Sequence, residues 1–368
     1  MKTIKYISAC LLLLMACLTA CYEGIDPLTP VAPGADGAAP VIKINYPSEG
    51  TLIRVKEDVT SLSIELEVTD DIELQTVSVS LDGKEIAAFG SFKDYRRAVE
   101  AFTYSQLGNG VHTLTVAAND LSGKTSSASV RFEKVQPYKP VYGNEQFYMP
   151  FDGDFMEMVS IGYAAKTGNP GFADGGKKGK AFAGAPDSYL TFPAQDAEGG
   201  VNLLQPEFSA LFWYKLNASP DRAGILVISP EDAANPEAMN NRLSGFRFFR
   251  EGSATKQTFK LNAGNGEAES WFDGGDAASL YPANAGWVHI AFTISASSCV
   301  IYFNGEAVCR GDFSGIDWND CSVLSVGSGA PRFTGWSHLS DQSLIDELRI
   351  FDKALAQQEI LSIFNAEK

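Results

Sequence analysis

The sequence of 368 residues predicts an all-β protein with two domains and one short helix at its C-terminal end. Three observations lead to this prediction. Short runs in which apolar and polar residues alternate recur along the chain, and a period of two is typical of strands with one buried face. Asp-Gly and Asn-Gly pairs stand between such runs, where tight turns are needed. The length also exceeds the roughly 150 residues of an average domain, which favours two domains.

The N-terminal segment has the composition of an export signal. Lys2 and Lys5 supply positive charge, and an apolar run over residues 7–20 leads to a cysteine at position 21. A run of this length is too short to span a bilayer, which takes about 20 residues. We therefore expect residues 1–20 to be removed as a signal peptide.

The last four residues of this segment, Leu-Thr-Ala-Cys, resemble the cleavage box of bacterial lipoproteins. The resemblance covers residues 1–21 and implies that Cys21 carries a lipid, which anchors the protein to a membrane without crossing it. A plain secretory signal with an incidental cysteine is the alternative. Tyr22 stands where inner-membrane lipoproteins of some bacteria have Asp, so the resemblance favours the outer membrane, with the protein facing the cell exterior.

The chain is acidic, with 29 Lys and Arg against 45 Asp and Glu and a formal net charge of −16. Removal of the signal takes away two lysines and no acid, which makes the remainder more acidic. Nucleic-acid binding depends on Lys and Arg that neutralise phosphates, so this balance argues against a nucleic acid as partner. It fits a soluble domain held away from an anionic surface.

The first half of the remaining chain predicts a stalk and a spacer domain. Residues 21–39 are rich in Pro, Gly and Ala and show no apolar period, which predicts a flexible stalk. Residues 40–136 contain alternating runs such as 76–81, which ends at the turn signal Asp82-Gly83. About seven strands in about a hundred residues are typical of a β-sandwich. The pattern resembles bacterial immunoglobulin-like domains, which implies a spacer.

Six segments stand out in the second domain, for which we expect the bounds 145–368. In chain order they are FYMPFDGDF (147–155), KKGKAFAGAPDSYLTF (177–192), FSALFWYKL (208–216), GWVHIAFTI (286–294), VIYFNGEAV (300–308) and IDELRIFDKALAQQEI (345–360). Together they resemble the laminin-G-like, or concanavalin-A-like, jelly-roll family. The resemblance implies two antiparallel sheets that face each other, with a concave face that often binds carbohydrate in relatives.

Apolar residues in these segments predict the core. Continuous apolar character around Phe208, Leu211 and Trp213 predicts a strand buried between the layers, and Trp287 and Phe292 share this pattern. The helix is expected at about 356–366, because four apolar side chains there share one face: Leu355, Ile360, Leu361 and Phe364.

Cysteine and histidine are scarce, and their positions predict structural roles. Cys299, Cys309 and Cys321 are expected as small buried hydrophobes, although an exported protein permits a disulfide and the pairing stays open. His289 has apolar neighbours and no partner at suitable spacing, so a structural role is favoured. His338, by contrast, is a candidate ligand-binding residue, because it lies in a loop insertion that is described below.

Three acids are candidate ligands of one structural calcium ion: Asp152, Asp154 and Asp346. Relatives often hold calcium with acids near the first strand and in the Ile-Asp-Glu segment. The first and last strands of a jelly roll run side by side, which would bring these carboxylates together, and Ca²⁺ needs six to eight oxygen ligands. The alternative is that the first two are turn residues and that Asp346 pairs with Arg349 or a backbone amide.

Loop aromatics are the candidate sugar-binding residues. Many relatives pass almost directly from the glycine at 335 to the strand at 345, so the intervening WSHLSDQSL is an insertion. Sugars stack their apolar faces on aromatic rings while polar side chains bond their hydroxyls. The candidate binding residues are Trp271, Trp318, Trp336, His338, Arg247, Asn262 and Arg332. The alternative for each tryptophan is a lid on the core.

No catalytic motif is recognisable. The glucanases of this architecture carry E-x-D-x-E on one strand, whereas Glu267 and Glu269 lack the middle Asp. The three histidines have no G-x-S-x-G motif beside them. We therefore expect no enzyme but a surface-anchored, lectin-like lipoprotein that captures oligo- or polysaccharides, which by resemblance would serve an outer-membrane glycan transporter complex.

Two other classes stay open. The protein could be an adhesion or interaction module without a sugar site, whose loop tryptophans contact a protein partner. It could also be a glycoside hydrolase with an unusual carboxylate pair. The latter requires Glu267 or Glu269 to face another acid within about 9.5 Å.

Overall fold

The structure, a computed structural model, describes residues 34–195, 201–284 and 286–368. The predicted signal peptide, Cys21 and most of the predicted stalk lie outside the described residues. The chain divides into two compact units, and the C-terminal unit comprises Arg54–Asp58 and Val135–Lys368. Within the described part of the chain, no helix is long and apolar enough to cross a membrane.

The N-terminal unit is a β-sandwich, as predicted. One sheet has the strand order β1 (Val41–Tyr46), β3 (Thr60–Thr69), β6 (Arg97–Leu107). The other has the order β2 (Leu52–Ile53), β8 (Thr125–Lys134), β7 (Gly110–Asp120), β4 (Leu74–Leu81), β5 (Lys84–Phe89). Alternate residues of β3 are buried in the core between these sheets. Asp82 and Gly83 have positive φ angles, which suits the tight turn that joins β4 to β5.

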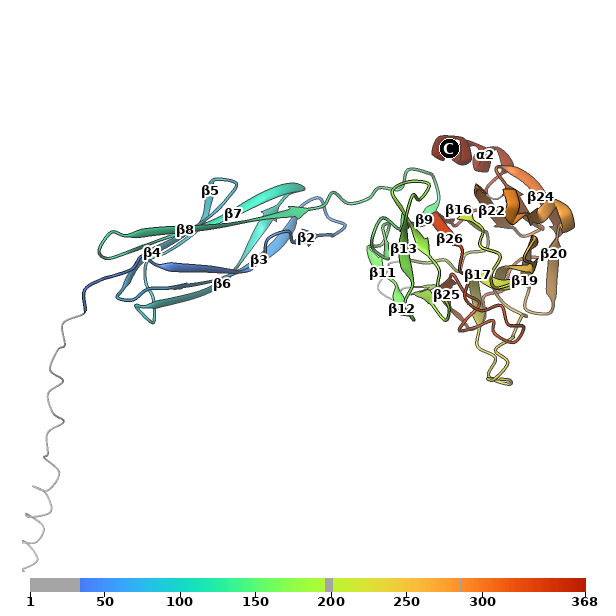
Figure 1. The fold of residues 1–368 in the computed structure, drawn as a ribbon, viewed down its shortest axis with the longest axis horizontal. Helices are drawn as coiled ribbons and strands as arrows, with labels where there is room; N and C mark the ends of the chain where they lie inside the picture. The colour runs from blue at the N-terminus through green and yellow to red at the C-terminus, as the bar shows by residue number, and fades with distance from the viewer. Residues whose placement is uncertain (1–33, 196–200, 285) are drawn as a thin grey trace, which may run out of the picture. The chain divides into compact units, whose positions relative to one another are not determined.

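The C-terminal unit consists mainly of two eight-stranded sheets (Figure 1). The loop-side sheet has the order β12 (Ala165–Thr167), β15 (Tyr189–Pro193), β25 (Cys321–Val326), β17 (Arg222–Pro230), β18 (Phe246–Ser253), β19 (Lys256–Gly264), β20 (Glu269–Asp273), with β21 (Ser279–Leu280) beside β19. The helix-side sheet has the order β13 (Gly171–Asp174), β14 (Lys180–Ala183), β26 (Leu344–Phe351), β16 (Phe208–Lys215), β22 (Trp287–Ile294), β23 (Ser298–Phe303), β24 (Glu306–Asp312), with β9 (Glu145–Met149) beside β26. A short hairpin, β10 (Met156–Glu157) and β11 (Gly162–Tyr163), completes the strands, and two 3₁₀ turns, η1 (Gly275–Ala278) and η2 (Pro282–Asn284), lie between β20 and β22.

The core lies between the two sheets, but β16 is buried on both of its faces. Phe208 and Phe212 point into the core between the sheets. Leu211 and Trp213 are equally buried, yet they point outward, toward the C-terminal helix α2 (Gln357–Glu367). The predicted burial of this strand is confirmed, and a third layer, helix α2, explains why its outward-facing residues are buried as well. Trp287 is only partly buried.

Helix α2 covers the outer face of the helix-side sheet (Figure 1). The helix was predicted, but its buried face differs from the predicted one. Ile360 and Ile363 are the buried apolar residues, whereas Leu361 and Phe364 are only partly buried. The Glu359 carboxylate accepts a hydrogen bond from the Ala356 amide at 2.8 Å and so caps the first turn.

The three cysteines among the described residues, Cys299, Cys309 and Cys321, are free thiols. Cys299 and Cys321 belong to the core between the sheets, and burial raises the pKa of both thiols, that of Cys321 to about 12. Cys299 and Cys309 are not opposite each other, because Cys299 pairs with Gly311 across the β23–β24 hairpin. The expectation of small buried side chains holds for Cys299 and Cys321, while Cys309 is partly exposed.

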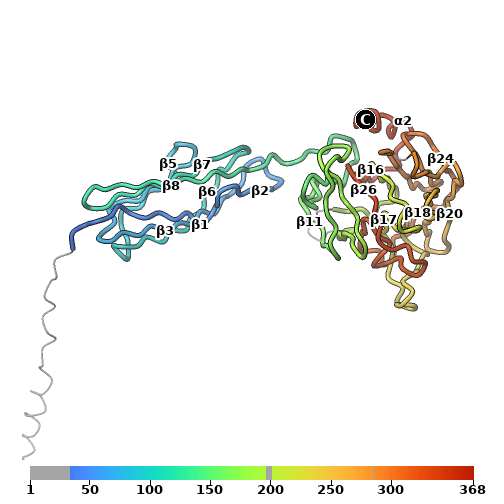
Figure 2. Tube along the Cα trace, in the orientation of Figure 1, coloured from blue at the N-terminus to red at the C-terminus, as the bar shows by residue number. Residues whose placement is uncertain are grey.

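Arg349 joins the first strand, the last strand and the terminal helix of the C-terminal unit. β9 lies beside β26 (Figure 1 and Figure 2), and Arg349 on β26 forms an ion pair with Glu145 on β9. Its Nε lies 2.8 Å from Oε1 of Glu367 in α2, and its Nη2 lies 3.1 Å from Glu347. The guanidinium carbon also lies 3.7 Å from the centre of the Tyr148 ring. These charged side chains are at most 4% exposed, so they are bonded to one another and not to water.

We expect Arg349→Met to lower the free energy of unfolding by about 3–5 kcal/mol, because it leaves the buried carboxylates of Glu145 and Glu367 without a cation. Urea unfolding followed by circular dichroism measures this loss. The matched control is Lys180→Ala, which removes an exposed ion pair with Asp174 and should cost less than about 1 kcal/mol. Equal effects of the two substitutions would contradict the central role of Arg349.

Candidate functional site

The loop between β25 and β26, residues 327–343, covers the outer face of the loop-side sheet. Phe333 is fully buried against Val227 and Phe249, which point outward from β17 and β18, and Trp336 packs on the same cluster. Within the loop, the Gly329 amide donates a hydrogen bond to the His338 carbonyl at 2.9 Å. The segment predicted as an insertion is thus a folded loop with its own apolar contacts.

A buried ion pair fixes the end of this loop. Asp341 accepts hydrogen bonds at 2.8 Å from Nη2 of Arg250 on β18 and from the hydroxyl of Ser343. The hydroxyl of Tyr214, on β16 of the helix-side sheet, donates to the other carboxylate oxygen. Arg250 and Asp341 are at most 1% exposed. Both sheets therefore hold the loop, and its position is set before any ligand binds.

The loop places Trp336 against Trp271 of β20. The two indole rings are stacked, with centroids 5.3 Å apart and planes 17° apart, and Trp271 is 42% exposed. The guanidinium carbon of Arg242 lies 4.3 Å from the centre of the Trp336 ring. Arg242 binds Glu269 with two nitrogens, Nη2 at 2.9 Å from Oε1 and Nε at the other oxygen. We call this group the Trp271–Trp336 platform.

Arg247 and Asn262 lie beneath the platform and have no exposed surface. The Arg247 guanidinium donates to the carbonyls of Asn241 and Ser244, and no carboxylate pairs with it among the described residues. Burial lowers the pKa of Arg247 to about 9. Nδ2 of Asn262 donates to Glu269 at 2.9 Å. In this conformation the two predicted binding residues position the platform and do not face a ligand.

His338 also points into the protein. Its ring is stacked on Phe333, with centroids 5.1 Å apart, and Nε2 lies 3.1 Å from Oε2 of Glu251. Burial lowers the pKa of His338 to about 4 against the attraction of the Glu251 carboxylate. The imidazole is therefore neutral at pH 7 and helps to attach the loop to the sheet.

Trp318 and Arg332 lie away from the platform. The indole Nε1 of Trp318 donates to the Gln205 carbonyl at 2.8 Å, and its ring packs against Phe208 and Phe246 of the core. This is the arrangement of a lid on the core, the alternative that the sequence left open. Arg332 forms an ion pair with Glu231.

Two polar residues of the platform, Arg242 and the paired Glu269, were not recognised as binding residues from the sequence. Arg242 precedes β18 in a segment without a motif, and Glu269 was weighed only as a catalytic acid. The hydrogen bond from Arg242 lowers the pKa of Glu269. A general acid of a glycosidase needs the opposite shift.

The three predicted calcium ligands bind protein donors in the structure. Asp346 is buried and accepts the backbone amides of Lys177 and Lys178 at 2.6 and 3.0 Å. Asp152 accepts the Lys180 amide, and Asp154 forms an ion pair with Arg54 at 2.8 Å. The described residues contain no group of three or more acidic, His or Cys side chains arranged to hold a metal ion. Calcium at these three residues stays a prediction.

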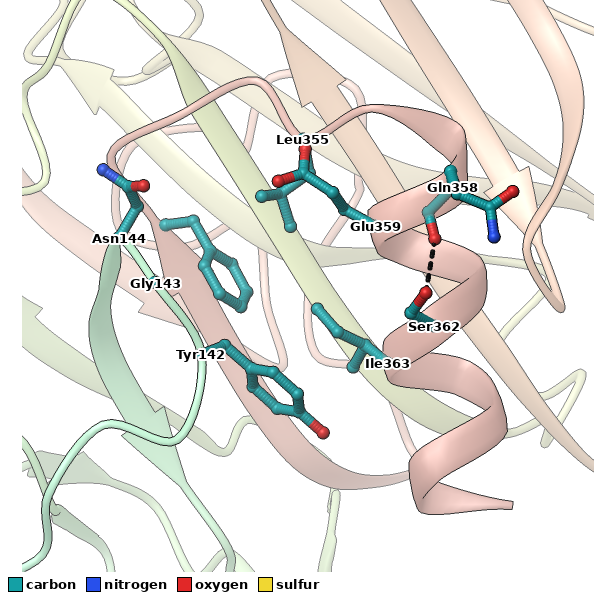
Figure 3. Close-up of a pocket in the computed structure, with 9 residues that line it drawn as sticks. Tyr142, Gly143, Asn144, Leu355, Gln358, Glu359, Ser362 and Ile363 are labelled. Atoms are coloured by element: carbon teal, nitrogen blue, oxygen red, sulfur yellow. Dashed lines mark hydrogen bonds between the residues drawn. The ribbon is translucent and has the colours of Figure 1, made fainter.

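A separate pocket of about 310 Å³ opens between residues 142–144 and helix α2 (Figure 3). Figure 3 shows the side chains of Tyr142 and Ile363 approaching each other from its two sides. The Ser362 hydroxyl on its rim donates to the Gln358 carbonyl at 2.8 Å. The pocket lies on the outer side of the helix-side sheet, away from the platform, and its floor is the apolar cluster that holds α2.

Comparisons with known proteins agree with this architecture. Residues 40–116 match the family described as Bacterial Ig domain, and residues 183–361 match the family described as Concanavalin A-like lectin/glucanases superfamily. The chain therefore combines a bacterial immunoglobulin-like domain with a concanavalin-A-like jelly roll. No curated protein matches the sequence.

Solved structures with a similar chain path include a domain of an arabinanase and a binding domain of a neurotoxin. Domain 4 of AbnA, a GH43 extracellular arabinanase from Geobacillus stearothermophilus solved with arabinotriose, is 18% identical with a TM-score of 0.45, over 60% of this chain and 98% of that one. The botulinum neurotoxin serotype C1 binding domain is 14% identical with a TM-score of 0.45, over 61% of this chain and 52% of that one. At these values neither similarity bears on what this chain binds.

The buried His338 predicts a loss of stability in acid. The unfolded chain takes up a proton near the ordinary pKa of 6.5, whereas the folded protein does so only near pH 4. The stabilisation is therefore complete above pH 6.5 and is lost as the pH falls toward 4, by up to about 3 kcal/mol. We expect His338→Gln to flatten the decline in unfolding free energy between pH 6.5 and 4, measured by urea unfolding. An unchanged decline would show that other groups cause it.

Proposed function

We propose that this protein is a surface-anchored, non-catalytic carbohydrate-binding protein. The observation that supports it most is the Trp271–Trp336 platform, in which a rigid loop holds one indole ring against another that is 42% exposed. The apolar face of a sugar ring stacks on an aromatic ring of this kind. Arg242 and Glu269, next to the rings, offer hydrogen-bond donors and acceptors for hydroxyl groups.

The rigidity of the site supports binding without catalysis. The Asp341 and Arg250 pair fixes the loop, so little conformational entropy is lost when a ligand binds. Glu269 is held as a carboxylate by Arg242, which suits a hydrogen-bond acceptor better than a proton donor. These features favour a lectin-like role over a hydrolase with an unusual carboxylate pair.

Anchoring and partner extend the proposal. Cys21 is the proposed lipid attachment point, in the outer membrane and facing the exterior, with the stalk and immunoglobulin-like domain as a spacer. Many tethered copies on a polymeric glycan give avidity even when one site is weak. The proposed task is the capture of oligo- or polysaccharides for an outer-membrane glycan transporter complex. A structural Ca²⁺ ion at Asp152, Asp154 and Asp346 is tested with a chelator below.

The first test is a glycan array with a protein that comprises residues 22–368, with and without a calcium chelator. We expect saturable binding to neutral glycans, because the platform carries paired charges. Trp271→Ala and Trp336→Ala should each weaken binding about tenfold or more, which corresponds to about 1.4 kcal/mol. The matched control is Tyr95→Ala, which removes an exposed aromatic residue of the N-terminal unit and should leave binding unchanged.

Binding by the parent protein that both tryptophan variants retain would place the sugar elsewhere. If the protein binds no glycan on a broad array while circular dichroism shows that it is folded, the carbohydrate proposal is contradicted. The platform would then be a contact for a protein partner, as expected for an adhesion module. Loss of binding in the chelator alone would support a role for calcium.

A further inference from the structure

A pocket lies beside the 327–343 loop. It has a volume of about 460 Å³, within the range of small-molecule sites. It is lined by Pro186, Asp187, Pro220, Asp221, Arg222, Ser337, Leu339, Ser340 and Gln342. Trp336 and His338 of the loop pack on the sheet, whereas Ser337 and Leu339 between and after them line this pocket, which we call the Leu339 pocket. One loop thus contributes to two surfaces.

Several polar side chains of the Leu339 pocket have no hydrogen-bond or ion-pair partner among the described residues. Asp187 and Asp221 are exposed, and no hydrogen bond or ion pair joins either carboxylate to another of the described residues. The same holds for the side-chain amide of Gln342. Arg222 has no carboxylate partner within the described chain and makes one hydrogen bond, from Nη1 to the Trp336 carbonyl at 3.0 Å.

The platform differs in this respect. There Arg242 pairs with Glu269, and Lys260 pairs with Glu251 and Asp273 at 2.9 and 2.8 Å. Its charged side chains are already bonded to one another, and its main free surface is aromatic. The two sides of the loop therefore offer different interactions, stacking on one side and hydrogen bonding on the other.

The wall of the Leu339 pocket is rigid and partly apolar. Leu339 is 41% exposed and forms an apolar surface with the two prolines. Nη1 of Arg250 donates to the Pro220 carbonyl at 2.7 Å, so the arginine that holds Asp341 also holds the opposite wall. The pocket is formed without a ligand, which lowers the entropic cost of binding.

The charges of the pocket indicate the class of ligand. Two carboxylates stand against one arginine in a protein whose net charge is −16, so an anionic ligand is repelled. Carboxylates and a guanidinium bond the hydroxyl groups of a sugar, while Leu339 and the prolines contact its apolar face.

We propose that the Leu339 pocket is a second subsite for a neutral oligosaccharide. It rests on the proposed function, because it assumes that the Trp271–Trp336 platform binds the same class of ligand. Arg222 lines the pocket and bonds to the backbone of Trp336, so the two subsites are neighbours. A glycan chain that is long enough contacts both, and its affinity then exceeds that for either subsite alone.

The test is a titration of ¹⁵N-labelled protein comprising residues 22–368, followed by NMR. The probes are neutral oligosaccharides of about two to six sugars from arabinan, xylan, mannan and β-glucan, and trigalacturonate as an acidic counterpart. The indole signals of Trp271 and Trp336 report on the platform, and the amide signals of Asp221, Leu339 and Gln342 report on the pocket. We expect a neutral ligand to shift both sets and trigalacturonate to shift neither.

Variants separate the two subsites. The double variant Asp187→Asn and Asp221→Asn should weaken binding of the longest ligand about tenfold and abolish the shifts at the pocket amides, while the indole shifts persist. Trp271→Ala should abolish the ligand shift of the Trp336 indole, while the shifts at the pocket amides persist. The control Asp174→Asn changes an exposed carboxylate outside the pocket and should bind like the parent protein.

Three other outcomes would each contradict a different part of the proposal. Ligand shifts confined to the indoles, with parent-like affinity in the double variant, would overturn the second subsite and leave carbohydrate binding intact. No shift with any neutral probe would overturn both the subsite and the proposed function. Pocket shifts with trigalacturonate as large as those with neutral chains would overturn the neutral class of ligand.

Discussion

The ion pair between Arg250 and Asp341 is the interaction on which the functional face depends. Arg250 belongs to the loop-side sheet, Tyr214 to the helix-side sheet and Asp341 to the loop, so one buried carboxylate connects all three. Burying a charge is costly unless every partner is in place. The pair therefore contributes less to net stability than to uniqueness, because any other path of the loop would leave a buried charge without a partner.

Both sheets of the jelly roll are covered on their outer faces as well as their inner ones. Helix α2 covers Leu211 and Trp213, and the 327–343 loop covers Val227 and Phe249. This explains why several strands read as continuous apolar runs and not as alternating ones. Arg349 closes the unit by joining its first strand to its last strand and helix, a task that the sequence led us to assign to calcium.

The sequence was sufficient for the strands, the turns, the C-terminal helix and the likeness to two known folds, because these depend on local patterns. It also led us to propose Trp271 and Trp336 as binding residues, but it did not indicate that their rings stack on each other. Whether Arg247, Asn262 and His338 are buried or exposed depends on the face of the strand or loop from which each side chain points. A shift of strand pairing by one residue moves every side chain to the opposite face, so the sequence alone does not determine it. Asp187 and Asp221 are far from the 327–343 loop in the sequence and come close to it only in the folded protein. No local sequence pattern predicts that they line one pocket with the loop.

The division of labour along the 327–343 loop has an evolutionary consequence. The scaffold holds this loop through buried contacts at Phe333, His338 and Asp341, while Ser337 and Leu339 are exposed at the Leu339 pocket. Substitutions at the exposed positions of this stretch can therefore change the surface of the loop without disturbing the sheets. The loop is thus a part of the fold in which the exposed positions tolerate change better than the strands that the loop covers.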